Sequence, residues 1–132
     1  MEKSTVSTNR KAYHEFQIIE TFEAGIELLG SEVKSLREGN ASLRESYVLI
    51  KKGQAWLVGM HISAYSHTGF SGHEPVRKRR LLLHKNEILK INQKLAEKGL
   101  TAVPLKIYFN KRGWLTVDIG LARGTKLYDK RA

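Results

Sequence analysis

The sequence contains no cysteine, which excludes disulfide bonds and thiolate chemistry. It has no apolar run close to the roughly 20 residues that cross a bilayer, and its first ten residues lack the apolar stretch of a secretory signal. Acidic residues are scarce: 13 Asp and Glu stand against 23 Lys and Arg, which gives a formal net charge of +10. These absences predict a soluble protein of the reducing cytosol with an excess of positive charge.

The positive charge is distributed unevenly along the chain. Residues 1–45 carry six Lys or Arg and eight Asp or Glu, whereas residues 46–132 carry 17 and five. A small protein with this excess favours a polyanion as its partner, and nucleic acid is the first hypothesis. An anionic membrane surface is the weaker alternative, because no predicted helix sets a lysine face against a Trp/Phe/Leu face.

The length of 132 residues predicts one domain with a core of its own. Residues 1–12 are polar and without periodicity, which predicts a flexible or loosely docked arm. Residues 13–122 hold the patterned segments and form the predicted folded domain. Residues 123–132 are basic and weakly patterned, and we interpret them as the start of a basic tail.

The segment Tyr13–Glu23 favours a half-buried strand, because its apolar residues recur at alternate positions. These positions are Phe16, Ile18 and Phe22, with Glu20 as the one polar break. Ala24-Gly25 marks a bend or bulge. After it, Ser31 is the expected N-cap of a short helix that places Val33 and Leu36 on one face.

Two hairpins and one longer helix are predicted farther along the chain. Tyr47–Lys51 and Gln54–Ile62 are β-prone and flank Lys52-Gly53, and Thr101–Phe109 and Trp114–Leu121 flank a second turn. Between the hairpins, Ile88, Ile91 and Leu95 follow helical spacing, and Gly99 is the expected residue after the helix end. The pattern predicts a mainly β fold with one long and one or two short accessory helices. A small, partly open antiparallel barrel of the oligonucleotide-binding (OB) type fits it.

Metal binding and catalysis find little support in the sequence. His61, His67 and His73 are spaced six apart without a His-x-x-x-His pair, so we interpret them as ordinary polar loop residues and predict no metal or cofactor. His14 and Glu23 can be read as an acid–base pair of a small ribonuclease, but their spacing does not require it. No P-loop, dinucleotide fingerprint or nucleophile elbow is present, so we predict no catalytic residue.

Clusters of cations are the stronger signal for nucleic acid. The run Arg77-Lys-Arg-Arg80 is predicted to lie beside a helix start, where guanidinium forks and backbone N–H groups suit phosphate. Lys34 and Arg37 are three apart on the short helix and project together. The tail adds Arg123, Lys126, Lys130 and Arg131. We interpret the strand aromatics Trp56, Tyr108, Phe109 and Trp114 as packing residues, with base stacking as the alternative.

Several segments form a specific set in this order: Asn9-Arg-Lys-Ala-Tyr-His-Glu15, Phe22-Glu-Ala-Gly25, Gly30-Ser-Glu-Val-Lys-Ser-Leu-Arg37, Ser46-Tyr47, Arg79-Arg-Leu-Leu-Leu-His84, Glu97-Lys-Gly-Leu100 and Asp129-Lys-Arg131. Together they resemble one family, small protein B, the bacterial protein that binds transfer-messenger RNA. The resemblance covers nearly the whole chain. It implies an OB-like barrel and an adaptor without catalytic residues. It also implies binding to the tRNA-like part of the RNA and delivery of that RNA to stalled ribosomes.

The resemblance also implies which residues face the RNA. Those that match are Asn9, Lys11, His14, Glu23, Arg37, Leu82, His84, Gly124 and Lys126. The neighbouring cations complete the candidate set: Arg10, Lys34, Arg77, Arg79, Arg80, Lys130 and Arg131. Glu23 is unusual on such a surface, but a carboxylate accepts hydrogen bonds from base or ribose donors and so sets register instead of adding affinity.

The implied partners are transfer-messenger RNA and the ribosomal decoding region, with elongation factor Tu and alanyl-tRNA synthetase reached indirectly through the RNA. We expect a monomer. Thr125 stands where family members commonly have Lys, which removes one expected phosphate contact. Members continue with a basic tail beyond the position of Ala132, so we expect this chain to bind RNA but to fail in tagging stalled peptides if it ends there.

Overall fold

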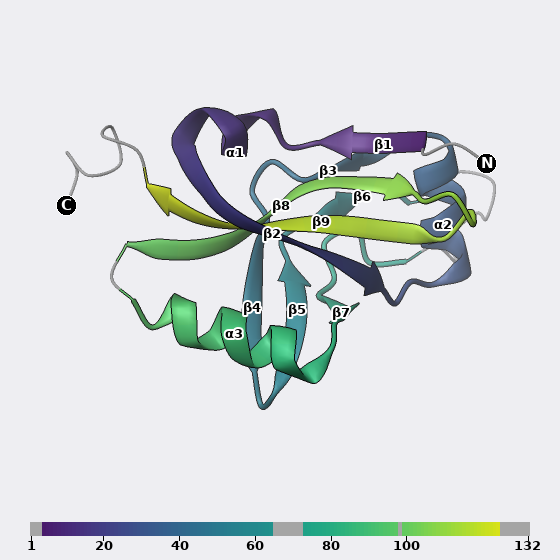
Figure 1. Cartoon of the computed structure of the whole chain (residues 1–132). Helices are drawn as coiled ribbons and strands as arrows, with labels where there is room; N and C mark the ends of the chain where they lie inside the picture. Colours follow the sequence, from purple (N-terminus) through teal and green to yellow (C-terminus); the bar gives the residue numbers. More distant parts are fainter. Residues whose placement is uncertain (1–3, 65–72, 98, 125–132) are drawn as a thin grey trace.

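A computed structural model of the chain describes residues 4–64, 73–97 and 99–124. Its main feature is an antiparallel sheet of seven strands in the order β1-β8-β9-β2-β7-β5-β4 (Figure 1). The strands are β1 (Ser4–Thr8), β2 (Phe16–Ile26), β4 (Tyr47–Lys51), β5 (Gln54–Val58), β7 (Arg79–Leu82), β8 (Leu100–Phe109) and β9 (Leu115–Gly124). A small second sheet pairs β3 (Ala41–Ser42) with β6 (His61–Ile62). The helices are α1 (Arg10–Glu15), α2 (Gly30–Arg37) and α3 (Lys85–Leu95).

The first predicted strand is present, but it begins at Phe16, because residues 10–15 form α1. Its alternation is as predicted: Phe22 and Ala24 are buried, while Thr21 and Glu23 are exposed. The irregularity in its pairing with β9 lies between Ile18 and Glu20 and not at the predicted Ala24-Gly25, where the register is continuous.

The flexible arm predicted for residues 1–12 is wrong for the described part of that segment. Ser4–Thr8 forms β1, which pairs with β8 at the edge of the large sheet, and α1 begins directly after it. The Asn9 N–H donates to the carbonyl of Leu105 at 2.8 Å and so continues the attachment. The polar sequence hid this strand because an edge strand is held by its backbone and needs few apolar side chains.

Both predicted hairpins are confirmed. β4 and β5 pair across Lys52-Gly53, whose φ angles of +53° and +74° lie in the left-handed region that such a turn requires. β8 and β9 pair along most of their length and, with β2, form the long central ribbon of the sheet. The predicted stripe of the long helix also holds, because Ile91 is fully buried and Ile88 and Leu95 pack beside the core.

Two apolar clusters lie on opposite sides of the central ribbon. The larger one joins β2, β9 and β8 to β4, β5, β7 and α3 through residues such as Phe22, Leu57 and Ile119. The smaller one lies beneath α1 and includes Ala12, Val103 and Leu105. β8 is therefore buried on both faces, which fits its nearly continuous apolar sequence.

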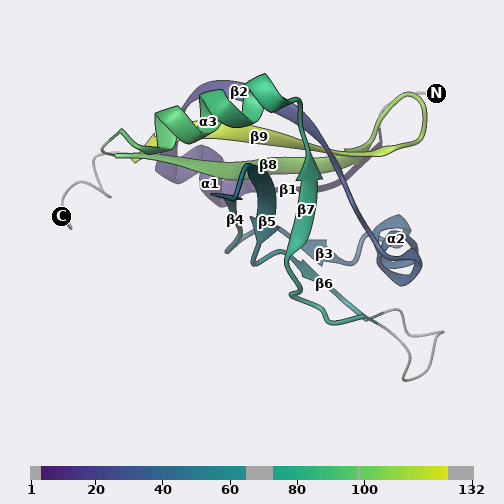
Figure 2. The same cartoon turned by 90° about the horizontal axis from the view of Figure 1, so that it is seen from below.

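The predicted fold class, mainly β with one long and two short helices, is confirmed. The sheet curls without closing: in the part of the chain that the structure describes, the edge strands β1 and β4 do not pair with each other. Both views place α1 and α2 at opposite ends of the sheet (Figures 1 and 2). None of the described helices is long and apolar enough to cross a membrane.

Candidate nucleic-acid interface

Helix α2 is capped differently from the sequence prediction. Its N-cap is Leu29, whose backbone N–H donates to Oε1 of Glu32 at 2.8 Å, so Glu32 supplies the cap from inside the helix. The predicted N-cap, Ser31, lies within the first turn. Its hydroxyl contacts Nδ1 of His73 at 2.8 Å and ties the helix to the segment before β7.

Glu32 is fully buried between two arginines, and this cluster anchors α2. Nη2 of Arg77 donates a hydrogen bond to Oε1 of Glu32 at 2.7 Å, and Nε of Arg79 donates one to Oε2 at 2.7 Å. Burial opposes the charged carboxylate, but the hydrogen bonds from Arg77, Leu29 and Arg79 outweigh it and hold the pKa of Glu32 below its usual 4.5. Burial likewise lowers the pKa of Arg79, and Glu32 counteracts that effect. Two cations and one anion thus leave the cluster with one positive charge.

The cation run 77–80 does not form the predicted phosphate site beside a helix start. Residues 79–82 form β7, and α3 begins only at Lys85. Arg79 has a side chain that is 0% exposed and also donates to the carbonyls of Met60 and Pro75, so its guanidinium is engaged within the fold. Arg77 is committed to Glu32, and Arg80 lies 3.7 Å from Glu27.

A groove of about 340 Å³ opens where the end of α2 meets the β8–β9 turn and the β2–β7 pair. Arg37 lies at this groove with its guanidinium 5.5 Å from the centre of the Phe109 ring. Trp114 is 69% exposed and Leu82 is 46% exposed, although both are large apolar residues. The groove therefore combines a cation, an exposed indole and an apolar floor, the combination that holds an unpaired base and its phosphate. Its lining is Gly25, Ile26, Leu28, Val33, Arg37, Leu82, Phe109, Gly113, Trp114 and Leu115.

Gly25 and Leu82 are paired residues of β2 and β7 at the floor of this groove. A Cβ at Gly25 would lie 3.4 Å from Cβ of Leu82, in tight van der Waals contact. The glycine therefore keeps space above the sheet beside the exposed leucine. Glu23 lies two residues earlier on the same face of β2 but does not itself line the groove.

Glu23 is held by a network across three strands. The Tyr108 hydroxyl on β8 donates toward Oε2 of Glu23 at 2.8 Å and Oδ1 of Asp118 at 2.9 Å. Lys106 lies 3.9 Å from the Asp118 carboxylate. The partner of Glu23 is thus Tyr108 and not His14, so the acid–base pair considered from the sequence does not form.

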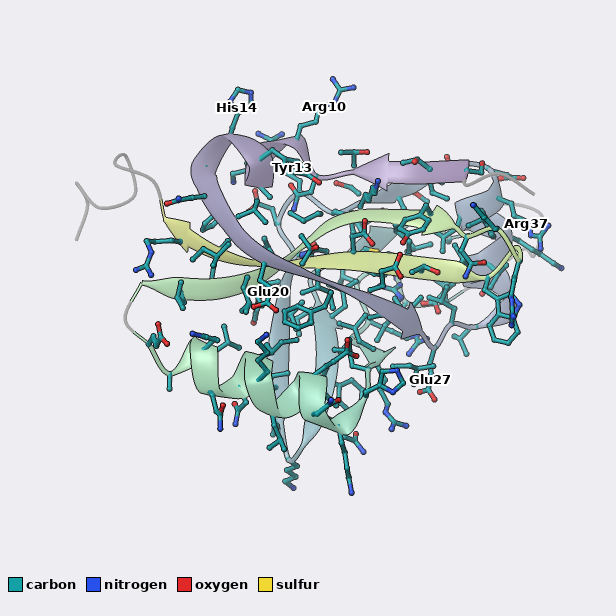
Figure 3. All side chains as sticks on the ribbon, viewed as in Figure 1. Arg10, Tyr13, His14, Glu20, Glu27 and Arg37 are labelled. Carbon is teal, nitrogen blue, oxygen red and sulfur yellow. The ribbon has the colours of Figure 1, made fainter. Side chains whose placement is uncertain are left out.

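The other candidate residues gather on and beside α1. Arg10 and His14 are exposed and project from α1 away from the sheet, on a different side of the molecule from Arg37 (Figure 3). Lys11 pairs with Glu45 at 3.1 Å on the surface. Asn9 is 4% exposed: its side chain accepts from the N–H of Ala12 and donates to the Pro104 carbonyl, so it is engaged within the fold as the cap of α1.

Three of the remaining candidates lie within the described residues. His84 is exposed as the residue before α3, Gly124 ends β9, and Lys34 is exposed on α2. Lys126, Lys130 and Arg131, together with Thr125, lie outside the described residues.

Sequence reasoning interpreted Trp114 and Tyr108 as packing residues, although Trp114 is exposed, and it did not single out Asp118. The available signal for Trp114 was its place directly after the Asn110–Gly113 turn, where a strand end is exposed. His73 has a structural role, since its ring nitrogens lie 2.8 Å from Ser31 Oγ and the Ile62 carbonyl. His67 falls outside the described residues, and no group of three metal-binding side chains occurs among those described.

Comparison with known proteins identifies the relatives of this chain. The sequence model of the family described as "SmpB protein" matches residues 6–132. An SsrA-binding protein of Chlorobaculum tepidum is 60% identical over 98% of this chain and 83% of the relative, and one of Trichodesmium erythraeum is 58% identical over 96% and 81%. A chain from the solved structure "tmRNA-SmpB: a journey to the center of the bacterial ribosome" is 48% identical, with a TM-score of 0.79 over 95% of this chain and 87% of that one. The resemblance found in the sequence motifs is thereby confirmed, and the chain belongs to the SmpB family.

Proposed function

We propose that this protein binds transfer-messenger RNA and acts with it on the bacterial ribosome as an adaptor in trans-translation. The observation that carries the proposal is the identity of 60% to an SsrA-binding protein across 98% of this chain. The fold agrees, because a tmRNA–SmpB structure of the bacterial ribosome superposes on it with a TM-score of 0.79. Such an adaptor works in the bacterial cytoplasm, where ribosomes are.

The groove beside α2 is our proposed contact with the tRNA-like part of the RNA. Trp114 offers an exposed ring on which an unpaired base stacks, and Arg37 offers a guanidinium for the adjoining phosphate. Glu23, on the same face of β2 as Gly25, accepts a hydrogen bond from a base or ribose donor. An RNA elbow presents unpaired bases of this kind, whereas a regular duplex hides them.

The exposed cations at both ends of the sheet supply affinity in this proposal. Arg10 and Lys11 lie at the α1 end, and Lys34 and Arg37 lie at the α2 end. His14 and His84 add donors near each end. Because such contacts release counterions from the RNA, binding falls steeply as salt rises. Elongation factor Tu and alanyl-tRNA synthetase are then reached through the RNA and not through this chain.

Binding assays at several salt concentrations test the proposal. Kd is measured for transfer-messenger RNA and for an unrelated folded RNA of equal length. We expect both affinities to decrease with salt, and transfer-messenger RNA to bind at least about tenfold more tightly throughout. Equal affinity for the two RNAs, or displacement of both by an unstructured oligonucleotide, would instead identify a general RNA binder.

The adaptor role, as opposed to an enzymatic one, has its own test. The purified protein and its His14→Ala variant are incubated with transfer-messenger RNA, and the RNA is resolved on a denaturing gel. We expect intact RNA with both proteins. Cleavage that disappears in His14→Ala would show a ribonuclease and contradict the proposal.

A further inference from the structure

Glu23 and Asp118 are directly opposite each other in the register of β2 and β9. Two carboxylates in this position repel, and a pair of like charges across strands normally destabilises a sheet. Both residues nevertheless occupy the central ribbon, Asp118 on β9 next to β8 and Glu23 on β2 one strand farther from it. Something on the neighbouring strand must therefore hold the two side chains together.

Tyr108 of β8 is that group. Its ring is 1% exposed, yet its hydroxyl reaches both carboxylates, at 2.8 Å from Glu23 Oε2 and 2.9 Å from Asp118 Oδ1. Tyr108 is paired with Thr116, so Asp118 is its diagonal neighbour across the strand pair, and Glu23 lies one strand farther. A hydroxyl has one proton, so the two acceptors share it.

The surroundings keep this hydroxyl protonated. Burial raises the pKa of Tyr108, and the hydrogen bonds and negative charges of Glu23 and Asp118 raise it further. Lys106 completes the network with its ammonium 5.5 Å from the tyrosine ring and 3.9 Å from Asp118. The Tyr108 hydroxyl thus keeps its proton, and remains a donor, at neutral pH.

We infer that Tyr108 is a positioning residue for RNA recognition, which fixes the Glu23 carboxylate through Oε2 and presents Oε1 to a base or ribose donor. The inference rests on the proposed function, in which Glu23 contacts RNA. An exposed glutamate on a strand has several rotamers, and ordering one of them on binding costs free energy. A Glu23 carboxylate that is already fixed in one rotamer avoids that cost when an RNA places a hydrogen-bond donor opposite it. An RNA that places a phosphate at the same position gains no hydrogen bond and is repelled. Tyr108 therefore contributes to discrimination between RNAs and not to general affinity.

The experiment uses the full chain with Tyr108→Phe, which removes one oxygen and keeps the buried ring. Tyr47→Phe is the matched control, because it removes the hydroxyl of a tyrosine on β4 that is 45% exposed. Kd is measured for transfer-messenger RNA and for the unrelated folded RNA. We expect Tyr108→Phe to reduce the ratio of the two affinities by about three- to tenfold and Tyr47→Phe to leave it unchanged.

A double-mutant cycle separates positioning from a general effect on the fold. If Tyr108 acts through Glu23, adding Tyr108→Phe to Glu23→Ala changes the ratio by less than about twofold. The carbon-13 signal of the Glu23 side-chain carboxyl should also shift in Tyr108→Phe and not in Tyr47→Phe. Equal losses from Tyr108→Phe in both backgrounds, or an unmoved carboxyl signal, would overturn the inference.

The cycle also distinguishes the two levels of the argument. Normal discrimination by Glu23→Ala would overturn this inference alone, because Tyr108 would then have no RNA contact to position. Absence of discrimination by the unaltered protein would overturn the proposed function itself and the inference with it.

Discussion

The two ends of the sheet present exposed cations on helices that are held in different ways. At one end, α1 is a helix of six residues beside the surface pair Lys11–Glu45, whose side chains are 38% and 72% exposed. At the other end, α2 is anchored by Glu32, which is 0% exposed between Arg77 and Arg79. Exposed ion pairs contribute little to stability, whereas removing one member of a buried pair is costly.

This difference shows that the positive charge of the sequence serves two separate purposes. Arg79 and Arg77 neutralise a buried carboxylate and fix α2 to the strand before α3. Arg10 and Arg37 remain on the surface, where a polyanion can reach them. Arg37 is thus carried by an immobilised helix, and its position over the groove is set before RNA arrives.

Removal of the buried carboxylate is the largest expected effect and the sharpest test of the comparison. Glu32→Ala leaves the buried guanidinium of Arg79 and the partly exposed one of Arg77 without their anion, so we expect a loss of about 3–5 kcal/mol in the free energy of unfolding. Urea denaturation followed by tryptophan fluorescence measures it. Glu45→Ala, which breaks only the surface pair at the α1 end, is the control and should cost less than about 1 kcal/mol. Similar losses in both variants would abolish the distinction between the two ends.

Acid should weaken the α2 end in the same way. The folded-state pKa of Glu32 is below its usual 4.5, so its contribution to stability is present above pH 4.5 and is lost as the pH falls through the folded value. We expect the difference in stability between the unaltered protein and Glu32→Ala to be constant from pH 7 to about 5 and to shrink below 4.5. Denaturation curves at several pH values check this, and a difference that grows in acid would contradict it.

At the α1 end, the corresponding structural residue is Asn9. Asn9→Ala removes the side-chain acceptor for the N–H of Ala12 and the donor to the Pro104 carbonyl, both in a buried setting. We expect a loss of about 1–3 kcal/mol, smaller than that of Glu32→Ala. Asn40→Ala, at an exposed position, serves as its control. Weaker RNA binding by Asn9→Ala should accompany its lower stability and disappear when the assay is cooled well below the unfolding midpoint.

The smallest changes concern the exposed arginines, because each makes one contact among several. Arg10→Ala and Arg37→Ala should leave stability within about 0.5 kcal/mol, and each should reduce the slope of log Kd against log salt by about one. Only Arg37→Ala should also lower the preference for transfer-messenger RNA, since it borders the groove. If Arg10→Ala lowers the preference for transfer-messenger RNA as much as Arg37→Ala does, both ends take part in recognition. The distinction between the α1 end and the α2 end in RNA binding would then be wrong.

Local patterning was sufficient to predict most of the strands. The alternation of Phe16, Ile18 and Phe22, the Lys52-Gly53 turn and the stripe of Ile88 and Ile91 all reflect burial or backbone geometry within a few residues. The helix α1 was not predicted, because six residues are too short to show helical periodicity. The N-cap of α2 was placed at Ser31 because the sequence does not reveal that Glu32 caps from within.

The candidate site was harder to predict because the sequence does not show whether a charged residue pairs with another residue of the fold or remains exposed. Arg79 and Arg80 are neighbours, yet one is buried against Glu32, 47 residues away, and the other lies near the surface. Asn9 matched an RNA-facing position of the family, but its side chain is turned inward as a helix cap. Motif resemblance identified the correct family, whereas only the packing separates exposed candidate residues from those engaged within the fold.

The strand β2 joins the two ends of the molecule. It extends for 11 residues, from Phe16 directly after α1 to Ile26 shortly before α2, with one irregularity in its pairing between Ile18 and Glu20. At roughly 3.3 Å per residue, it spans on the order of 30 Å, and it pairs with β9 over nearly its whole length. The strand therefore sets a fixed spacing between the exposed cations of α1 and those of α2. Any RNA that contacts both sets of cations has to place phosphates on the order of 30 Å apart.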